Sequence, residues 1–153
     1  MARKSFNEKL HNSGDLPRIE EITDARMISR YGGSRMLIAP AIYYDQAMRK
    51  IPFGMLTTAD EIRAYLARKH GADFTCPLTA GIFINIAASA SWERVTDETP
   101  YWRTLKKDGM LNEKYPIGIE GHKKLLESEG HTVIQRGSRY FVKDYEQNLF
   151  KFR

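Results

Sequence analysis

The sequence predicts an α+β fold that is mainly helical. Apolar residues recur at helical spacing over 58–71 and 77–91, in the middle of the chain, and again over 118–130. Closer to the C-terminus, β-prone runs at 132–135 and 140–143 flank an Arg-Gly-Ser-Arg turn, which is a pattern typical of a hairpin. Three helices and a hairpin are therefore the elements that the sequence predicts most directly.

Composition and length indicate one soluble domain. The 153 residues are 42% hydrophobic and 28% charged, which is ordinary for a globular protein. No apolar run approaches the roughly 20 residues that a membrane span needs, so we expect no membrane partner. The N-terminal residues lack the apolar segment of a secretory signal, and the single cysteine, Cys76, excludes an internal disulfide. We therefore expect one domain over 1–153 in the cytoplasm.

The excess of positive charge lies in the C-terminal third. Residues 1–102 carry 13 Lys and Arg against 12 Asp and Glu, whereas residues 103–153 carry 11 against 7. Positive charge beside aromatic residues indicates a polyanionic partner, because each neutralised phosphate releases counterions. A basic surface that only keeps the protein soluble is the alternative, and charge alone does not decide between the two.

The first 50 residues are expected to form a helical extension that covers the core. A short amphipathic helix is predicted over 2–12, a second from the Asp24 cap through Tyr31, and a third over 41–48. Between the first two helices, 19–22 is a brief apolar patch.

Two longer helices follow this extension. Thr58 and Glu61 have the spacing of a capping box, and the helix that begins there is expected to end at His70-Gly71. The next helix starts at Pro77, a residue that suits the first helical position. Its apolar residues expected to face inward are Leu78, Ile82, Phe83, Ile86, Ala87 and Ala90.

The stretch 99–105, Thr-Pro-Tyr-Trp-Arg-Thr-Leu, is expected to be a strand that enters a hairpin at Asp108-Gly109. Two helices joined by a polar turn and followed by such a hairpin and a further helix are the parts of a winged helix-turn-helix. The chain then divides into an N-terminal extension over 1–50, a winged-helix core over 51–131, and a C-terminal hairpin and tail over 132–153.

Several residues that could carry chemistry have simpler interpretations. Cys76 precedes a helix whose dipole can lower a thiol pKa, but we favour a small buried residue without chemistry. Asp60 and Glu61 point about 100° apart on a helix, so we do not expect an acid/base pair. None of the histidines has metal-ligand spacing to a partner, and we expect neither a metal nor a cofactor. Of Tyr101 and Trp102, one is expected to pack in the core.

The chain resembles a known family in several separate blocks over 51–131. The blocks are Ile51-Pro52-Phe53-Gly54, the capped helix from Thr58 to Leu66, Pro100-Tyr101-Trp102-Arg103, Asp108-Gly109, Tyr115-Pro116-Ile117-Gly118, and the run from Leu125 to His131. Their order and spacing resemble the DNA-binding domain of methylated-DNA–protein-cysteine methyltransferases and of their alkyltransferase-like relatives.

The resemblance implies that the reactive motif of that family has been replaced. The family motif is Pro-Cys-His-Arg, in which the Cys accepts an alkyl group and the His, backed by a Glu, deprotonates the Cys through water. Here Tyr101 replaces the nucleophile and Trp102 replaces the base, while Glu129 matches the supporting carboxylate. A phenol with a pKa of about 10 and no base accepts alkyl groups poorly, so alkyl transfer is not expected.

The resemblance therefore implies a non-catalytic DNA-binding protein of alkyltransferase-like type, which recognises damaged bases in double-stranded DNA and flags them for other repair proteins. Expected phosphate contacts are Arg103, Lys106, Lys107, Lys114, Lys123 and Lys124, with Thr79 and Asn85 nearest the bases. Candidates to line a pocket are Tyr101, Trp102, Glu129, Ile117 and Tyr115.

Two alternatives stay open. The first is a base-flipping, glycosylase-like enzyme in which Tyr101 and Trp102 stack on the base and Glu129 or Glu98 activates water. The second is a protein-interaction module, with Tyr101, Trp102 and the N-terminal extension forming the interface.

Overall fold

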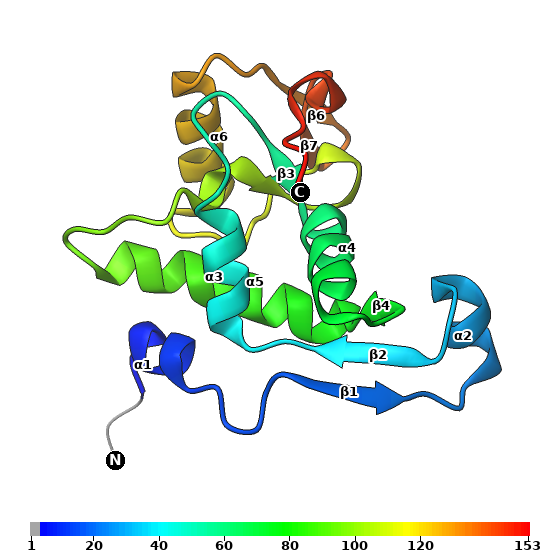
Figure 1. Cartoon of the computed structure of the whole chain (residues 1–153). Coiled ribbons are helices and arrows are strands. Elements are labelled where there is room, and N and C mark those ends of the chain that lie inside the picture. The colour runs from blue at the N-terminus through cyan, green and yellow to red at the C-terminus, as the bar shows by residue number, and fades with distance from the viewer. Residues whose placement is uncertain (1–3) are drawn as a thin grey trace.

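The computed structural model describes residues 4–153, and its helices and strands form a mixed α and β fold (Figure 1). The elements of the N-terminal segment are α1 (Phe6–His11), β1 (Arg18–Glu21), α2 (Ala25–Tyr31), β2 (Arg35–Ile38) and α3 (Ala41–Met48). The middle of the chain forms β3 (Thr57–Thr58), α4 (Ala59–His70), β4 (Phe74–Thr75), α5 (Pro77–Glu93) and β5 (Thr104–Leu105). The C-terminal elements are α6 (Gly118–Ser128), β6 (Val133–Arg136) and β7 (Arg139–Val142). No helix among the described residues combines the length and the apolar character that crossing a membrane would need.

The N-terminal segment contains two strands in addition to its predicted helices. Its three predicted helices are present as α1, α2 and α3, although residues 2 and 3 of the first prediction lie outside the described residues. Between them, β1 and β2 form an antiparallel pair in which Ile19 lies opposite Leu37. Strands form here because Met36, Leu37 and Ile38 are buried together, and the backbone of β2 forms hydrogen bonds with a strand on each side.

The small sheet links the N-terminal segment to the middle of the chain. Its strand order is β1-β2-β4, and β4 runs parallel to β2 with Met36 opposite Phe74. The Asp73 carboxylate, just before β4, also accepts a hydrogen bond of 3.0 Å from the Arg35 amide. The extension is therefore held by backbone pairing as well as by side-chain packing.

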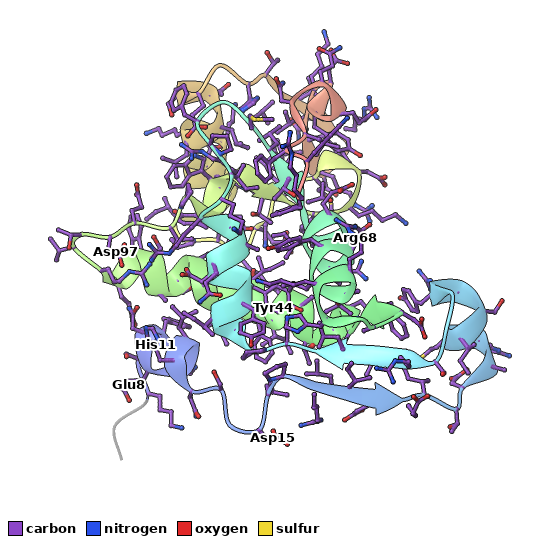
Figure 2. The ribbon with its side chains drawn as sticks, in the orientation of Figure 1. Glu8, His11, Asp15, Tyr44, Arg68 and Asp97 are labelled. Atoms are coloured by element: carbon purple, nitrogen blue, oxygen red, sulfur yellow. The ribbon has the colours of Figure 1, made fainter. Side chains whose placement is uncertain are left out.

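Figure 1 shows α3 and α4 side by side, with α5 crossing behind both. The Thr58 cap of α4 is confirmed, because the Thr58 hydroxyl accepts the Glu61 amide at 3.2 Å. Tyr44 of α3 is fully buried, and Figure 2 shows it at the lower end of α3, between α3 and α4. Side chains from all three of these helices join one apolar cluster that extends from Leu10 to Val142.

The predicted inward face of α5 was wrong at two positions. Leu78 is 73% exposed and Ile82 is 50% exposed. The residues that face the core are mostly small: Ala80, Ile84, Ala87, Ala88, Ala90 and Ser91. Because α5 is apolar on all sides, the periodicity of its sequence does not show which side faces the core. The small residues on the buried side let α1 and α3 approach α5 closely.

The predicted strand over 99–105 was also wrong. Tyr101–Arg103 forms a 3₁₀ turn, and only Thr104–Leu105 is extended, pairing parallel with β3. The Asp108-Gly109 turn exists as a 3₁₀ turn over Lys107–Gly109, but the chain after it forms only a bridge from Met110 to Phe141. Burial of Tyr101 and Trp102 outweighs their strand propensity, because a 3₁₀ turn brings both rings into the interior.

The C-terminal prediction was confirmed. β6 and β7 form an antiparallel hairpin around Gly137, with Arg136 opposite Arg139. After a 3₁₀ turn over Tyr145–Asn148, the tail returns to the centre, where the Leu56 amide donates to Asn148 and the Phe150 amide donates to Leu56.

Candidate functional site

Glu129, at the C-terminal end of α6, is the centre of a buried hydrogen-bond network. Its carboxylate accepts bonds from Trp102 Nε1 at 2.7 Å, from the Gly54 amide at 2.9 Å, and from Arg103 through Nε and Nη2, both at 2.9 Å. Arg103 also donates through Nη1 to the Ile51 carbonyl at 2.7 Å. The network therefore joins the segment before β3, the 3₁₀ turn and α6.

The charges of Arg103 and Glu129 neutralise each other within this network. The Arg103 and Glu129 side chains are 13% and 3% exposed. Burial by itself raises the pKa of Glu129, but hydrogen bonds from Arg103, Gly54 and Trp102, with the Arg103 charge, lower that pKa below its ordinary value. Since its donors are directed to Glu129 and Ile51, Arg103 serves here to hold the fold rather than to present a cation at the surface.

Tyr101 is packed into an aromatic cluster. It is 3% exposed, and its ring makes edge-on contacts with Trp102 and Tyr115 at centroid distances of 5.4 and 5.2 Å. Burial, and secondarily the Glu98 charge, raises the pKa of Tyr101 above its ordinary value. Because Tyr101 and Trp102 are buried, they do not offer the exposed protein interface that the sequence suggested.

A hollow of about 400 Å³ borders Tyr101 on one side. Trp92, Val95 and Glu98 from the end of α5 and the following loop also line this hollow. Trp92 is 58% exposed and Val95 fully exposed, so the hollow opens at an apolar patch of the surface.

His122 is a site residue that sequence reasoning missed. It is fully buried, and its Nδ1 accepts the Asn112 amide at 3.1 Å, so its Nε2 proton donates to the Trp102 carbonyl at 2.8 Å. Burial lowers the pKa of His122 to about 4, against the opposing effect of that hydrogen bond. His122 and Leu126 are the two buried residues of α6, four positions apart on its apolar side.

The structure brings the loop lysines and α5 together in one groove of about 430 Å³. Its lining includes Lys106, Lys107 and Lys114 from the loop and Leu78 and Ile82 from α5. The other polar residues of the lining are Arg63, Asn85, Thr104, Asn112, Glu113 and Tyr115. Lys106 is 3.4 Å from Glu113, and Arg63 is paired with Asp60 on its own helix. Five of the residues expected from the sequence, Lys106, Lys107, Lys114, Asn85 and Tyr115, therefore meet at one place.

Asn112 holds the lysine loop against α5 by side-chain hydrogen bonds. Its Nδ2 donates to Asn85 Oδ1 at 2.9 Å, and its Oδ1 accepts the Lys114 amide at 2.9 Å. The side chain is only 7% exposed, so the lysine loop is tied to the middle of α5. The Tyr115 hydroxyl adds a bond of 2.8 Å to the Thr104 carbonyl, across the base of the same loop.

The remaining predicted residues lie elsewhere. Lys123 and Lys124 are on α6, the first half-buried and the second exposed. Thr79 is half-buried on α5, and its hydroxyl is directed to the Cys76 carbonyl at 3.5 Å. Ile117 is 65% exposed in a left-handed conformation with φ 65°, and its side chain lies against Gly121 at the start of α6.

Metal chemistry has no support in the described residues, since no three His, Cys, Asp or Glu side chains within 4–153 are grouped to hold an ion. Cys76 is half-buried at the start of α5.

Helices α4 and α5 before a lysine loop, a 3₁₀ turn over Tyr101–Arg103, and α6 ending at a buried glutamate belong to a fold similar to that of alkyltransferase-like proteins. The S. pombe protein Atl1, solved in complex with damaged DNA containing O6-carboxymethylguanine, is 19% identical with a TM-score of 0.53. The match covers 72% of this chain and 94% of that chain. A structure of S. pombe ATL in complex with DNA is 18% identical over the same shares, with a TM-score of 0.50. Comparisons of the sequence with protein-family models and with curated proteins found no match. The resemblance predicted from the sequence is thus confirmed at the level of the fold.

Proposed function

We propose that this protein binds double-stranded DNA, recognises damaged bases without repairing them itself, and flags them for other repair proteins. The observation that carries the proposal is the groove along α5, which is lined by three lysines and by exposed apolar residues of the helix. The solved structures of similar fold were both determined with DNA, which supports the same class of partner here.

In this proposal α4 and α5 act as a helix-turn-helix, and residues 104–115 act as the wing. Lys106, Lys107 and Lys114 contact phosphates, and Lys123 and Lys124 extend that path along α6. Thr79 and Asn85 lie nearest the base edges. Asn85 uses its carbonyl oxygen for Asn112, which leaves its amide protons to donate to a base.

The exposed apolar residues of α5 define how it would approach the duplex. Leu78 and Ile82 are exposed and lie one helical turn apart. The first turn of α5 has no acidic residue, and its last turn has no basic residue. Apolar side chains of this kind enter the minor groove and unstack base steps, while flanking cations hold the phosphates. A bent, partly unstacked duplex is therefore the form that this surface fits.

The aromatic cluster argues for binding without alkyl transfer. Burial keeps the Tyr101 phenol protonated by raising its pKa, and the Trp102 indole can only donate a hydrogen bond. Glu129 already accepts from three residues, so it has no free position for activating water in this arrangement.

Gel-shift titrations test the proposal, using an ordinary duplex and duplexes with defined O6-alkylguanine bases at several salt concentrations. Phosphate contacts from the five lysines predict that log affinity falls with log salt with a slope of about −4.5. The double variant Lys107→Glu/Lys114→Glu should lose more than about tenfold in affinity and flatten this slope, whereas Arg26→Glu, a charge reversal on α2, should change neither. Affinity that ignores salt, or equal losses in the two variants, would refute the groove as the binding surface.

One observation favours Glu98 over Glu129 as the carboxylate of the glycosylase-like alternative. Glu98 lines the same hollow as Tyr101, whereas Glu129 is occupied. Duplexes with alkylated or deaminated bases, incubated with the protein and then with alkali, would show strand scission that disappears in Glu98→Gln. Intact strands across that panel would exclude this chemistry.

A further inference from the structure

A second basic cleft lies between α3, the C-terminal half of α4 and the C-terminal tail. Two adjoining hollows, of about 510 and 590 Å³, form this cleft and share Lys50 and Tyr65 in their linings. Figure 1 shows α3 and α4 side by side with the C-terminus close to the upper end of α4. None of the residues that line the cleft within 4–153 also lines the groove along α5.

The cleft carries positive charge that is not neutralised. Lys50, Lys69, Lys151 and Arg153 are exposed, and none of them forms an ion pair within the part of the chain that the structure describes. Arg49 also borders the cleft, but it is paired with Asp45 and Asp97. No acidic side chain of residues 4–153 lines either hollow, so the cleft complements a chain of negative charges.

The same cleft is lined by aromatic rings. Tyr43 stacks on His70 at a centroid distance of 5.3 Å, and Phe152 stacks on Tyr65 at 4.4 Å. The Tyr43 and Phe152 rings are both half-buried, so part of each remains accessible from the cleft. The Lys69 ammonium lies 5.9 Å from the centre of the Tyr65 ring, which places a cation beside the aromatic surface.

His70 supplies a polar group for such a ligand. Its Nε2 is buried and has no hydrogen-bond partner among the described residues, although the ring lines the first hollow. A buried nitrogen without a partner is costly unless a bound group or water completes it.

We propose that this cleft binds a single strand of nucleic acid, with phosphates along Lys50, Lys69 and Lys151 and unpaired bases stacked on Tyr43 and Phe152. Bases in a duplex are stacked on one another, so only an unpaired base can offer its face to these rings. Two hollows that adjoin at Lys50 and Tyr65 fit successive nucleotides of a strand better than a single free nucleotide. This site is separate from the proposed duplex surface and does not depend on it.

Fluorescence anisotropy with a labelled oligothymidylate of about 12 nucleotides tests the proposal in the full chain. The variant Lys69→Glu/Lys151→Glu changes only exposed side chains; it should weaken binding of the oligonucleotide by more than about tenfold and leave duplex affinity within about twofold. The matched control, Lys107→Glu/Lys114→Glu, should leave oligonucleotide affinity within the same twofold range. Because each variant addresses one surface, loss of one proposal is distinguishable from loss of the other.

Stacking is tested separately from charge. The variant Tyr43→Leu should weaken binding of the oligothymidylate by roughly tenfold, but should not change binding of an abasic strand with the same phosphates. Circular dichroism confirms that the variants are folded. Unchanged oligonucleotide affinity in the lysine variant would overturn the site. An abasic strand, inorganic polyphosphate or thymidine monophosphate competing as well as the oligothymidylate would overturn the assignment to a single strand.

Discussion

Replacing Glu129 by Gln tests the central network, because it removes the charge and keeps the shape. The variant leaves the Arg103 guanidinium, 13% exposed, without a counter-ion in the interior. The NH₂ group of the glutamine side chain is itself a donor, so it cannot accept the hydrogen bonds that Trp102, Gly54 and Arg103 donate to the carboxylate. Breaking a buried pair from one side costs about 3–5 kcal/mol in the free energy of unfolding. For a chain of this length that corresponds to a fall in Tm of roughly 10 °C.

Urea unfolding and thermal melting measure the loss, and Glu127→Gln, an exposed change on the same helix, is the matched control. A double-mutant cycle with Arg103→Met isolates the pair, because that second change removes the stranded cation and should recover much of the stability. A loss below about 1 kcal/mol in Glu129→Gln would refute the conclusion that this network holds the three segments together.

The pH dependence gives a second readout of the same residue. The pKa of Glu129 is lower in the folded chain than in the unfolded one. Its contribution to stability is therefore complete above the unfolded value of about 4.3 and is lost as the pH falls through the folded pKa. Glu129→Gln should remove this part of the acid-dependent loss, and equal acid sensitivity in both proteins would contradict the assignment.

Three further predictions concern the residues around the groove. Asn112→Ala should lower the free energy of unfolding by about 1–3 kcal/mol and weaken duplex binding, because the loop that carries Lys114 loses its hydrogen bond to Asn85. Unchanged gel shifts would show that the position of this loop does not matter for binding. His122 has a folded pKa of about 4, below its unfolded value of about 6.5, so its contribution to stability is complete above about pH 6.5 and is lost as the pH falls toward 4. Nuclear magnetic resonance titration should show His122 uncharged at pH 6, and a midpoint near 6.5 would contradict its burial. Gly109→Ala should destabilise the chain by more than about 1 kcal/mol, because φ is 82° and an added Cβ meets the Tyr145 ring, whereas Gly137→Ala, with φ 61° and open space, should cost less in the same melting assay.

The groove was predictable in its parts but not in its assembly. The lysines of 106–114 and Asn85 were evident from their types and from their neighbours in the sequence. That Asn112 joins them, and that Arg103 turns inward to Glu129, depends on residues 26 to 27 positions apart in the chain. Local patterns contain no information on such pairs, so the sequence could nominate Arg103 only as a surface cation.

The sequence by itself determined the caps, helix ends and turns that depend only on neighbouring residues. The Thr58 cap, Pro77 at the start of α5, the Gly71 end of α4 and the hairpin around Gly137 each depend on backbone groups within a few residues. Tertiary structure alone decided that Leu78 faces outward, that 101–103 turns instead of extending, and that β2 finds β4. In these segments several conformations have similar local free energy, and burial of Tyr101, Trp102 and the small residues of α5 selects one of them.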